Sequence, residues 1–135
     1  MTSIALIVAA GKGVRTGLNT PKQYIEIAGK SILRRTIDAF LVHPGIDNVC
    51  VVVGEDDLPL YEEAISGLDL LPPVFGGATR QESVRNGLES LVDHAPGFVL
   101  IHDAARPFIS TELISRCLNK LAQADAVLPS LAIAD

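Results

Sequence analysis

The sequence predicts a three-layer α/β/α domain with a mainly parallel central sheet. Apolar runs recur along the chain, they do not alternate with polar residues, and amphipathic helical patterns separate them. Strands that are apolar on both faces are typical of a parallel sheet covered by helices. The 135 residues are enough for one domain with a sizeable core.

The apolar runs define the expected strands. Four runs have the composition of buried strands, and they cover residues 4–8, 49–53, 98–101 and 126–128. A shorter run at residues 73–75 is a further candidate. Each expected strand is followed by a helical pattern until the last strand, which predicts strict alternation of strand and helix along the chain.

Four helical patterns lie between these runs. The first is an apolar stripe that ends before Pro44: Ile32, Leu33, Thr36, Ile37, Phe40 and Leu41. A second, weaker pattern covers residues 58–68. Thr79 and Glu82 form a capping box for the third helix, with an expected apolar face of Val84, Leu88, Leu91 and Val92. Ser110 or Thr111 caps the fourth, whose inward residues are Leu113, Ile114, Cys117, Leu118 and Leu121.

Composition narrows the classes of function. The formal net charge is -5, and aromatic residues make up 4% of the chain. Such a chain lacks the basic surface and the stacking side chains that nucleic-acid binding requires. The N-terminal apolar run is too short to cross a membrane, and no basic segment precedes it as in a secretory signal. We expect a cytoplasmic protein in which Cys50 and Cys117 are reduced core residues.

The loop after the first strand concentrates positive charge. Lys12, Arg15 and Lys22 are the only charged side chains among the first 25 residues. Gly11 and Gly13 allow close approach of the backbone to a ligand, and successive N–H groups in such a turn bind anions. Ligands of open α/β folds bind at the carboxyl ends of strands, where this loop lies. The loop therefore predicts a polyphosphate site, with an ordinary solvated turn as the alternative.

Spacing excludes the two commonest phosphate-binding loops. The segment from Gly11 to Thr16 lacks the third glycine of the dinucleotide fingerprint, and no Gly-Lys-Ser/Thr occurs at the spacing of a Walker loop. Arg15 and Lys22 can instead converge on one phosphate, with Pro21 fixing the chain direction. Two cations on one phosphorus would stabilise the charge that develops when an oxygen attacks it.

Three motifs occur in order along the chain. They are AAGKGVR followed by PKQY, GGATRQESV at residues 76–84, and HDAARP at residues 102–107. Together they resemble the 2-C-methyl-D-erythritol 4-phosphate cytidylyltransferases of the non-mevalonate isoprenoid pathway. The resemblance implies a Rossmann-like nucleotidyltransferase fold and transfer of CMP from CTP to the polyol phosphate, with release of pyrophosphate. It also implies Mg²⁺, or another divalent cation, bound with CTP.

The same resemblance implies a role for each site residue. Arg15 and Lys22 would be the catalytic cations at the α-phosphate. Asp103 and Arg106 would lie near the polyol phosphate and the metal nucleotide. From its position directly after a buried strand, Asp103 could either accept substrate hydroxyls or act as a metal ligand. CTP itself would be bound by Ala9, Ala10, Gly11, Gly13, Lys22, Gly77, Ala78, Ser83 and Ala104.

Structural roles are the alternatives at several of these positions. Ser83 could be a surface helix residue, and Asp103 could be a helix cap paired with the nearby Arg106. We expect Arg80 and Arg85 to lie on a solvated helix face, and we expect a structural role for His102. The chain also departs from the family at two positions, with Thr16 where Met is frequent and Ala78 where Asp is common.

Other functions stay open at this point. Ribitol-5-phosphate cytidylyltransferases are similar, but they tend to have AGG and HDSVRP where this chain has AAG and HDAARP. Hexose-phosphate nucleotidyltransferases usually space the loop and its Pro-Lys differently. A non-catalytic nucleotide-binding domain is an alternative from another class, and the intact Arg15 and Lys22 argue against it.

The resemblance also has implications for architecture beyond residue 135. Members of the family continue there with a β-arm that forms a homodimer and completes the neighbouring site. We therefore interpret residues 1–135 as a single nucleotidyltransferase domain, truncated at its C-terminus, with weak or absent turnover in isolation. Some members are fused to the later cyclodiphosphate synthase of the same pathway, which makes a bifunctional fusion an alternative architecture.

Overall fold

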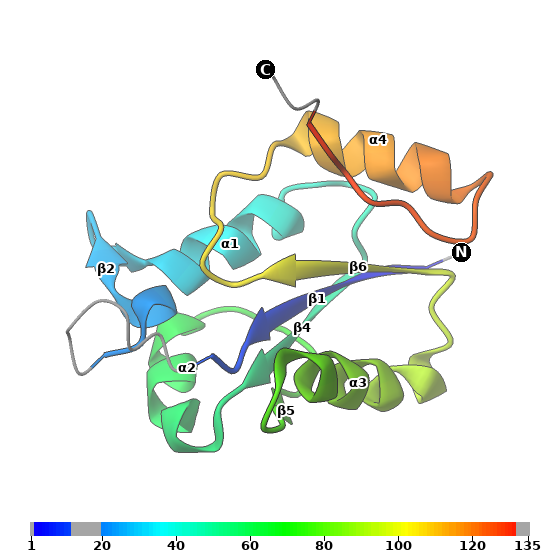
Figure 1. Cartoon of the computed structure of the whole chain (residues 1–135). Coiled ribbons are helices and arrows are strands. Elements are labelled where there is room, and N and C mark those ends of the chain that lie inside the picture. Colours follow the sequence, from blue (N-terminus) through cyan, green and yellow to red (C-terminus); the bar gives the residue numbers. More distant parts are fainter. Residues whose placement is uncertain (1, 12–19, 132–135) are drawn as a thin grey trace.

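A four-stranded parallel sheet forms the centre of the domain (Figure 1). The computed structural model describes residues 2–11 and 20–131. The sheet has the order β5-β4-β1-β6, with β1 at Ser3–Ala9, β4 at Asn48–Val53, β5 at Val74–Phe75 and β6 at Phe98–Asp103. All three pairings are parallel, as the apolar runs predicted.

Helices cover both faces of this sheet (Figure 1). One face packs against residues of α1 (Ile32–Leu41), α2 (Leu58–Ala64) and α4 (Thr111–Leu121). The other face packs on α3 (Arg80–Ser90) and on Leu91 behind it. Alternate residues of β1 enter the two clusters, with Ile7 on the first side and Leu6 on the second. The three-layer α/β/α architecture is therefore confirmed.

Side-chain caps begin three of the helices. The side-chain oxygens of Ser31, Thr79 and Ser110 each accept an N–H from three residues further on. Glu82 reaches back as predicted, but it accepts the N–H of Ala78 at 2.8 Å, one residue before the cap Thr79. Short 3₁₀ helices occupy Lys22–Tyr24 (η2), Glu55–Asp57 (η3) and Val92–His94 (η4). Helix α2 ends earlier than predicted, and Gly67 turns the chain behind it with a φ of 84°.

The buried face of α3 differs from the prediction. The structure buries Ser83, Gly87 and Leu91, whereas Val92 is 70% exposed. A Cβ on Gly87 would lie only 2.7–2.9 Å from side chains of the sheet. Glycine therefore lets α3 lie close on the sheet along the row 83, 87 and 91. The prediction is confirmed for Leu91 and wrong for Leu88 and Val92, because an apolar pattern gives no weight to a serine and a glycine in the buried row.

Two segments were not predicted correctly. A short hairpin joins β2 (Glu26–Ile27) to β3 (Lys30–Ser31) through Ala28 and Gly29, whose φ angles are 53° and 85°. Two positive φ values fit a type I′ turn, but alanine is an unusual residue for it. The predicted strand at residues 126–128 is wrong, because within the described residues this run pairs with no strand. Pro129 has no N–H for a ladder, and Leu128 is 88% exposed.

Strand order places the functional segments at one edge of the sheet. The chain runs from β1 outward to β4 and β5, then returns to β6 on the other side of β1. Parallel sheets bind ligands at the carboxyl ends of strands where the order reverses in this way.

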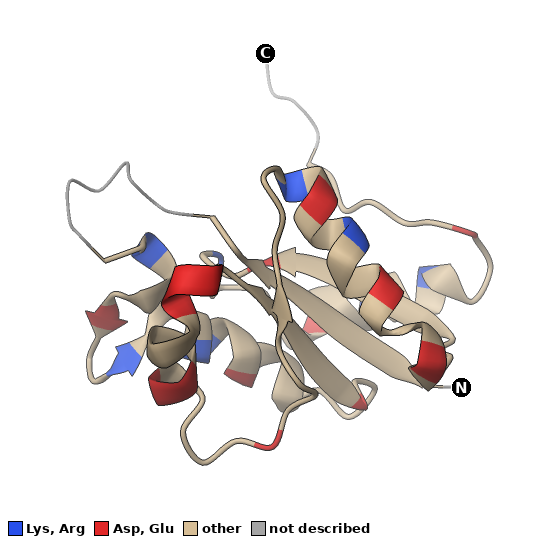
Figure 2. Cartoon of the chain, turned by 90° about the horizontal axis from the view of Figure 1, so that it is seen from below, with Lys and Arg blue, Asp and Glu red and all other residues tan. Residues whose placement is uncertain are grey.

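Charged residues lie mostly on helices and turns around the central strands, which are tan in Figure 2. Among the described residues, no helix has the length and apolar content needed to cross a bilayer.

Candidate active site

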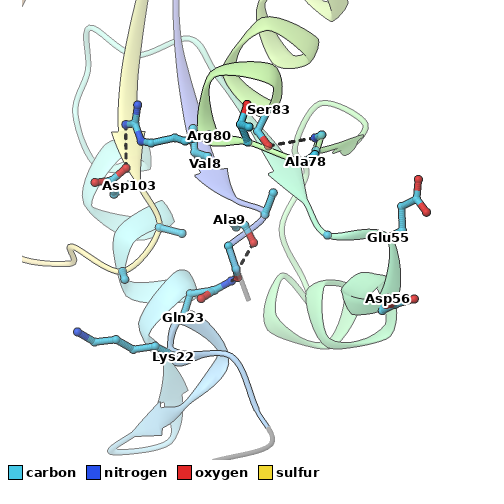
Figure 3. A pocket seen from close by; sticks show the side chains of 18 of the residues that line it. Val8, Ala9, Lys22, Gln23, Glu55, Asp56, Ala78, Arg80, Ser83 and Asp103 are labelled. Atoms are coloured by element: carbon cyan, nitrogen blue, oxygen red, sulfur yellow. Dashed lines mark hydrogen bonds and ion pairs between the residues drawn. The ribbon is translucent and has the colours of Figure 1, made fainter. Parts of the chain in front are cut away.

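A pocket of about 1250 Å³ lies at the carboxyl ends of the strands (Figure 3). The segments that follow all four parallel strands line it: residues 8–11, 54–56, 76–80 and 103–106. Lys22, Gln23 and Ser83 complete the lining. The pocket is therefore large enough for a nucleotide, and it brings all three sequence motifs together.

The start of the cationic loop forms one wall. Ala9, Ala10 and Gly11 line the pocket as predicted for the CTP site. The backbone there is held by Gln23, whose Nε2 donates to the Ala9 carbonyl oxygen at 2.8 Å and to the Gly11 carbonyl oxygen at 2.9 Å. Two predicted site residues, Gly13 and Arg15, lie outside the described residues, and their roles stay predictions.

Lys22 adds a positive charge to the same wall. It is the first residue of η2, it is exposed, and it lines the pocket. Within residues 2–11 and 20–131 it forms no ion pair. A cation without a carboxylate partner, beside backbone of a glycine loop, suits an anionic ligand.

A glycine turn forms the opposite wall. The N–H of Gly77 donates to Ser83 Oγ at 3.1 Å, and Ser83 is 2% exposed. A Cβ on Gly76 would lie 2.3 Å from the Cβ of Ala10 and 2.6 Å from Ser83 Oγ. Glycine is thus required where the two walls touch. The alternative of a surface position for Ser83 is wrong, because its hydroxyl is a buried support of the turn.

The end of β6 carries a charged cluster. Asp103 Oδ1 accepts from Arg80 Nη2 at 2.9 Å, and Asp103 Oδ2 lies 3.3 Å from Arg106 Nε. Partial burial raises the pKa of Asp103, but the hydrogen bond and charge of Arg80, with the charges of Arg106 and His102, outweigh it. The net pKa of Asp103 is lowered, so its carboxylate is ionised at neutral pH.

Arg80 is not the purely solvated residue that the sequence predicted. Although its side chain is 61% exposed, it lines the pocket and reaches from α3 to Asp103 on β6 (Figure 3). The prediction is confirmed for Arg85, which is 77% exposed and pairs with Glu89 on the same helix. The reason for the difference is position, since Arg80 begins α3 at the pocket edge and Arg85 lies more than one turn further on.

Backbone contacts fix the residues on either side of Asp103. Ala104 is 3% exposed, its N–H donates to the Val8 carbonyl oxygen at 3.0 Å, and its carbonyl oxygen accepts from Thr36 Oγ1 at 2.8 Å. The Nε2 of His102 is 2.8 Å from the Arg106 carbonyl oxygen, in agreement with a structural role for this ring. Ala104 therefore lies in a fixed position at the pocket floor.

One comparison decides the family. The model of the family described as 2-C-methyl-D-erythritol 4-phosphate cytidylyltransferase matches residues 3–135. This chain belongs to that family. The match includes every motif from which the resemblance was predicted.

Similar proteins agree with the family. The bifunctional enzyme IspD/IspF of Paramagnetospirillum magneticum is 50% identical over 133 residues, which are 98% of this chain and 35% of that protein. The enzyme of the same name from Rhodopseudomonas palustris strain HaA2 is 49% identical over 131 residues, which are 97% of this chain and 33% of that protein. The solved 4-diphosphocytidyl-2C-methyl-D-erythritol synthase of Anaerococcus prevotii has a TM-score of 0.76 and 32% identity, covering 90% of this chain and 51% of that one. The chain thus spans about a third of the length of the curated relatives it matches.

A serine–histidine pair elsewhere in this family member is not a nucleophile. His43 Nε2 lies 2.8 Å from Ser115 Oγ, while His43 Nδ1 accepts the N–H of Gly45 at 2.9 Å. Because Nδ1 is the acceptor, the neutral ring carries its proton on Nε2 and donates it to the serine. It cannot remove a proton from Ser115, so the pair links the segment that follows α1 to α4.

Sequence reasoning missed two contributions to the site. Gln23 belongs to the PKQY motif, but no role was predicted for it. A polar, uncharged residue between the cation Lys22 and the buried Tyr24 was the available signal. The pairing of Arg80 with Asp103 had no signal, because residues 80 and 103 meet only through the sheet topology.

Proposed function

We propose that the full-length protein transfers CMP from CTP to 2-C-methyl-D-erythritol 4-phosphate and releases pyrophosphate, a step that supplies isoprenoid precursors. The observation that carries this proposal is the joining of residues 9–11, Lys22 and the turn at residues 76–78 in one pocket. The family match over residues 3–135 supports the choice of reaction.

The triphosphate occupies the wall that carries Lys22. Residues 9–11 present backbone at the end of β1, and the loop that continues from them carries Gly13 and the second predicted cation, Arg15. Such a loop binds phosphate oxygens through N–H groups. Lys22 and Arg15 act at the α-phosphate, where negative charge develops during transfer.

Cytosine occupies the wall built by the glycine turn. The N–H groups of Gly77 and Ala78 already donate to Ser83 and Glu82. The turn therefore offers carbonyl oxygens, which accept from the exocyclic amine of cytosine, while uracil has an acceptor at that position. The hydroxyl proton of Ser83 supplies a donor for an acceptor on the base edge. The ribose lies beside Ala104 at the pocket floor.

The reaction needs no covalent enzyme intermediate. An oxygen of the polyol phosphate forms a bond to the α-phosphorus of CTP. The bond from that phosphorus to the oxygen bridging to the β-phosphorus breaks, and pyrophosphate leaves with the electron pair. The chain contributes positioning and positive charge, from Arg15 and Lys22 at the α-phosphate and from Arg106 beside the second substrate.

We also propose Mg²⁺, or another divalent cation, as the metal that accompanies CTP. Within the described residues no three His, Cys, Asp or Glu side chains are grouped to hold a metal ion. Asp103 is the one carboxylate of the HDAARP motif at the pocket, and it would hold the ion. Mg²⁺ is usually bound by one or two carboxylates together with substrate phosphates, so this donor set fits. When bound, the ion neutralises charge on the triphosphate.

Pyrophosphate release by the full-length protein tests the proposal. CTP with 2-C-methyl-D-erythritol 4-phosphate is the expected pair, and UTP, ATP and ribitol 5-phosphate serve as competitors. Release with ribitol 5-phosphate alone would replace the proposed substrate, and CTP binding without any release would favour a non-catalytic nucleotide domain. Light scattering of the same sample tests the homodimer, which the family resemblance implies, and cell fractionation tests the cytoplasmic location expected from the sequence.

A further inference from the structure

Gln23 is a buried polar side chain that lines the pocket, although the proposed reaction assigns it no task. It is 5% exposed, and its Nε2 lies within hydrogen-bond distance of the carbonyl oxygens of Ala9 and Gly11. Both acceptors are carbonyl oxygens, so the amide nitrogen and not the amide oxygen must face them. One carboxamide thus holds both ends of the three-residue segment that begins the loop, and Figure 3 shows Gln23 beside Ala9.

We propose that Gln23 is a positioning residue that fixes the start of the phosphate-binding loop relative to Lys22. The inference rests on the proposed function, because the placement matters only if the loop and Lys22 act on one nucleotide. Gln23 touches neither substrate nor metal in this role. It acts through the backbone of residues 9–11.

The two hydrogen bonds determine where a loop N–H points. Among the described residues every peptide bond is trans, and in a trans peptide the C=O and the next N–H point in opposite directions. Because the Ala9 carbonyl faces Gln23, the Ala10 N–H points away from Gln23. A donor fixed in direction before the ligand arrives stabilises developing charge without reorganisation.

The element that carries Gln23 also carries the cation. Within η2, Lys22 precedes Gln23 and Tyr24 follows it, with Tyr24 6% exposed in the main core cluster. The N–H of Tyr24 donates to the Pro21 carbonyl oxygen at 3.0 Å, and the N–H of Ile25 donates to the Lys22 carbonyl oxygen at 3.1 Å. The loop and Lys22 are therefore placed by one anchored turn.

The second wall depends on the same segment. Ala10 lies directly against the glycine turn, since a Cβ on Gly76 would come within 2.3 Å of the Ala10 Cβ. A Cβ added to Gly54 would lie 3.7 Å from the Ala10 carbonyl oxygen, so Ala10 also lies close to the segment that follows β4. A displaced segment would therefore disturb both the triphosphate side and the base side of the pocket.

Three variants of the full-length protein test this role. Gln23→Met keeps the length of the side chain and removes both donors. Gln23→Glu removes them at neutral pH, but a protonated carboxyl regains one donor. Gln123→Met is the matched control, because Gln123 is exposed and lies outside the pocket. For each variant, kcat and KM for CTP are measured by pyrophosphate release between about pH 5.5 and 8, and the melting temperature is recorded.

A positioning role predicts a pH signature. Gln23→Met should lower kcat/KM for CTP about 10- to 100-fold, the scale expected for a misplacement near 1 Å, and its ratio to wild type should not change with pH. Gln23→Glu should lose at least as much at pH 8, because a carboxylate faces two carbonyl oxygens, and should recover several-fold relative to wild type as the pH falls. Gln123→Met should match wild type throughout.

Several outcomes would overturn the inference. The first is a folded Gln23→Met protein whose kcat/KM for CTP lies within two-fold of wild type. The second is an equal pH dependence of kcat/KM for the Met and Glu variants. The third is loss of the fold in both variants, which would make Gln23 purely structural. Failure of the proposed function is distinct, because the wild-type protein and Gln123→Met would then release no pyrophosphate from CTP with any polyol phosphate.

Discussion

The two sides of the pocket are built very differently. Along residues 9–11 and the turn at 76–78, the pocket is held by hydrogen bonds of two buried side chains, Gln23 as donor and Ser83 as acceptor, which are 5% and 2% exposed. Toward β6, it is bordered by ion pairs of Asp103 with Arg80 and Arg106, whose side chains are 39–77% exposed. Buried hydrogen bonds fix geometry, whereas exposed ion pairs contribute little and rearrange readily.

This contrast assigns a different task to each side. The first side, which we call the buried wall after its two buried side chains, joins the two facing walls described above: residues 9–11 with Gln23, and the turn at 76–78 with Ser83. Lys22 lies at its edge. The buried wall is preorganised, as expected for a wall that selects a base and holds a triphosphate. The second side, the exposed wall, comprises Arg80, Asp103 and Arg106. Its charges are paired with one another, so they must exchange partners when a phosphate or metal arrives.

The largest effect should come from the one unpaired cation of the buried wall among the described residues. Lys22→Ala in the full-length protein should lower kcat about 100- to 1,000-fold, on the scale of removing a donor from an oxyanion site. The melting temperature should not change, because Lys22 is exposed and makes no ion pair in the described part of the chain. Lys120→Ala, on the exposed side of α4, is the control. Unchanged turnover in Lys22→Ala would contradict the assignment of this residue.

Gly76→Ala should break the contact within the buried wall. The new Cβ would lie 2.3 Å from the Cβ of Ala10, and relieving such overpacking costs about 1–3 kcal/mol of unfolding free energy. CTP binding should weaken as well, because the segment around Ala10 must move. Gly11→Ala is the matched control for stability, since its Cβ would meet no atom within 4 Å. Denaturant unfolding and calorimetric titration with CTP measure both effects, and equal stability of the two variants would argue against the contact.

Ser83→Ala should have a comparable or slightly smaller effect. It removes the acceptor of the Gly77 N–H, and the loss of this partly buried hydrogen bond costs about 0.5–1.5 kcal/mol of unfolding free energy. Discrimination between CTP and UTP should also fall, because the turn loses its support. Ser66→Ala removes a hydroxyl from an exposed position and should leave both quantities unchanged. A Ser83→Ala protein with the stability of wild type and the same discrimination between CTP and UTP would show that the turn keeps its conformation without the Ser83 hydroxyl.

The smallest effect should appear on the exposed wall. Arg80→Gln removes the main partner of Asp103, and because both side chains are exposed the unfolding free energy should change by at most about 1 kcal/mol. The pKa of Asp103 should rise toward its ordinary value, which NMR titration of the carboxyl carbon can follow. Arg85→Gln, which removes the pair with Glu89, should leave that pKa unchanged. Equal pKa values in the two variants would contradict the contact of Arg80 with Asp103.

The same ion pair gives a pH dependence of defined sign. The pKa of Asp103 is lower in the folded protein than in the unfolded chain. Its contribution to stability is therefore fully present above the unfolded pKa and is lost as the pH falls through the folded pKa. In Arg80→Gln this small acid-dependent loss should be reduced.

The sequence predicted the parts of the molecule that depend on local pattern. Runs of apolar residues predicted the parallel strands, and side-chain oxygens before helices predicted caps such as Ser110 and Thr79. The motifs predicted which residues meet in the pocket, because each follows a strand and parallel strands bring their carboxyl ends together. These predictions needed only neighbours along the chain and one rule of sheet topology.

The failures share a different origin. The face of α3 is chosen by a close approach at Gly87, and a missing side chain leaves no mark in an apolar pattern. The run at residues 126–128 has strand composition, but a strand also needs a partner that composition does not supply. Gln23 and Arg80 act across distances of 12–23 residues in the sequence. Such contacts become visible only once the fold places the residues together.

Hydrogen exchange of the full-length protein with CTP alone tests the central claim that the buried wall is a preformed nucleotide site. We predict strong protection of the peptides that cover residues 8–11 and 76–83, and weaker protection of both with UTP at the same concentration. At residues 103–106 the change should be smaller, because without the second substrate only the ribose beside Ala104 reaches this segment. Equal protection by CTP and UTP, or protection confined to residues 103–106, would contradict the account.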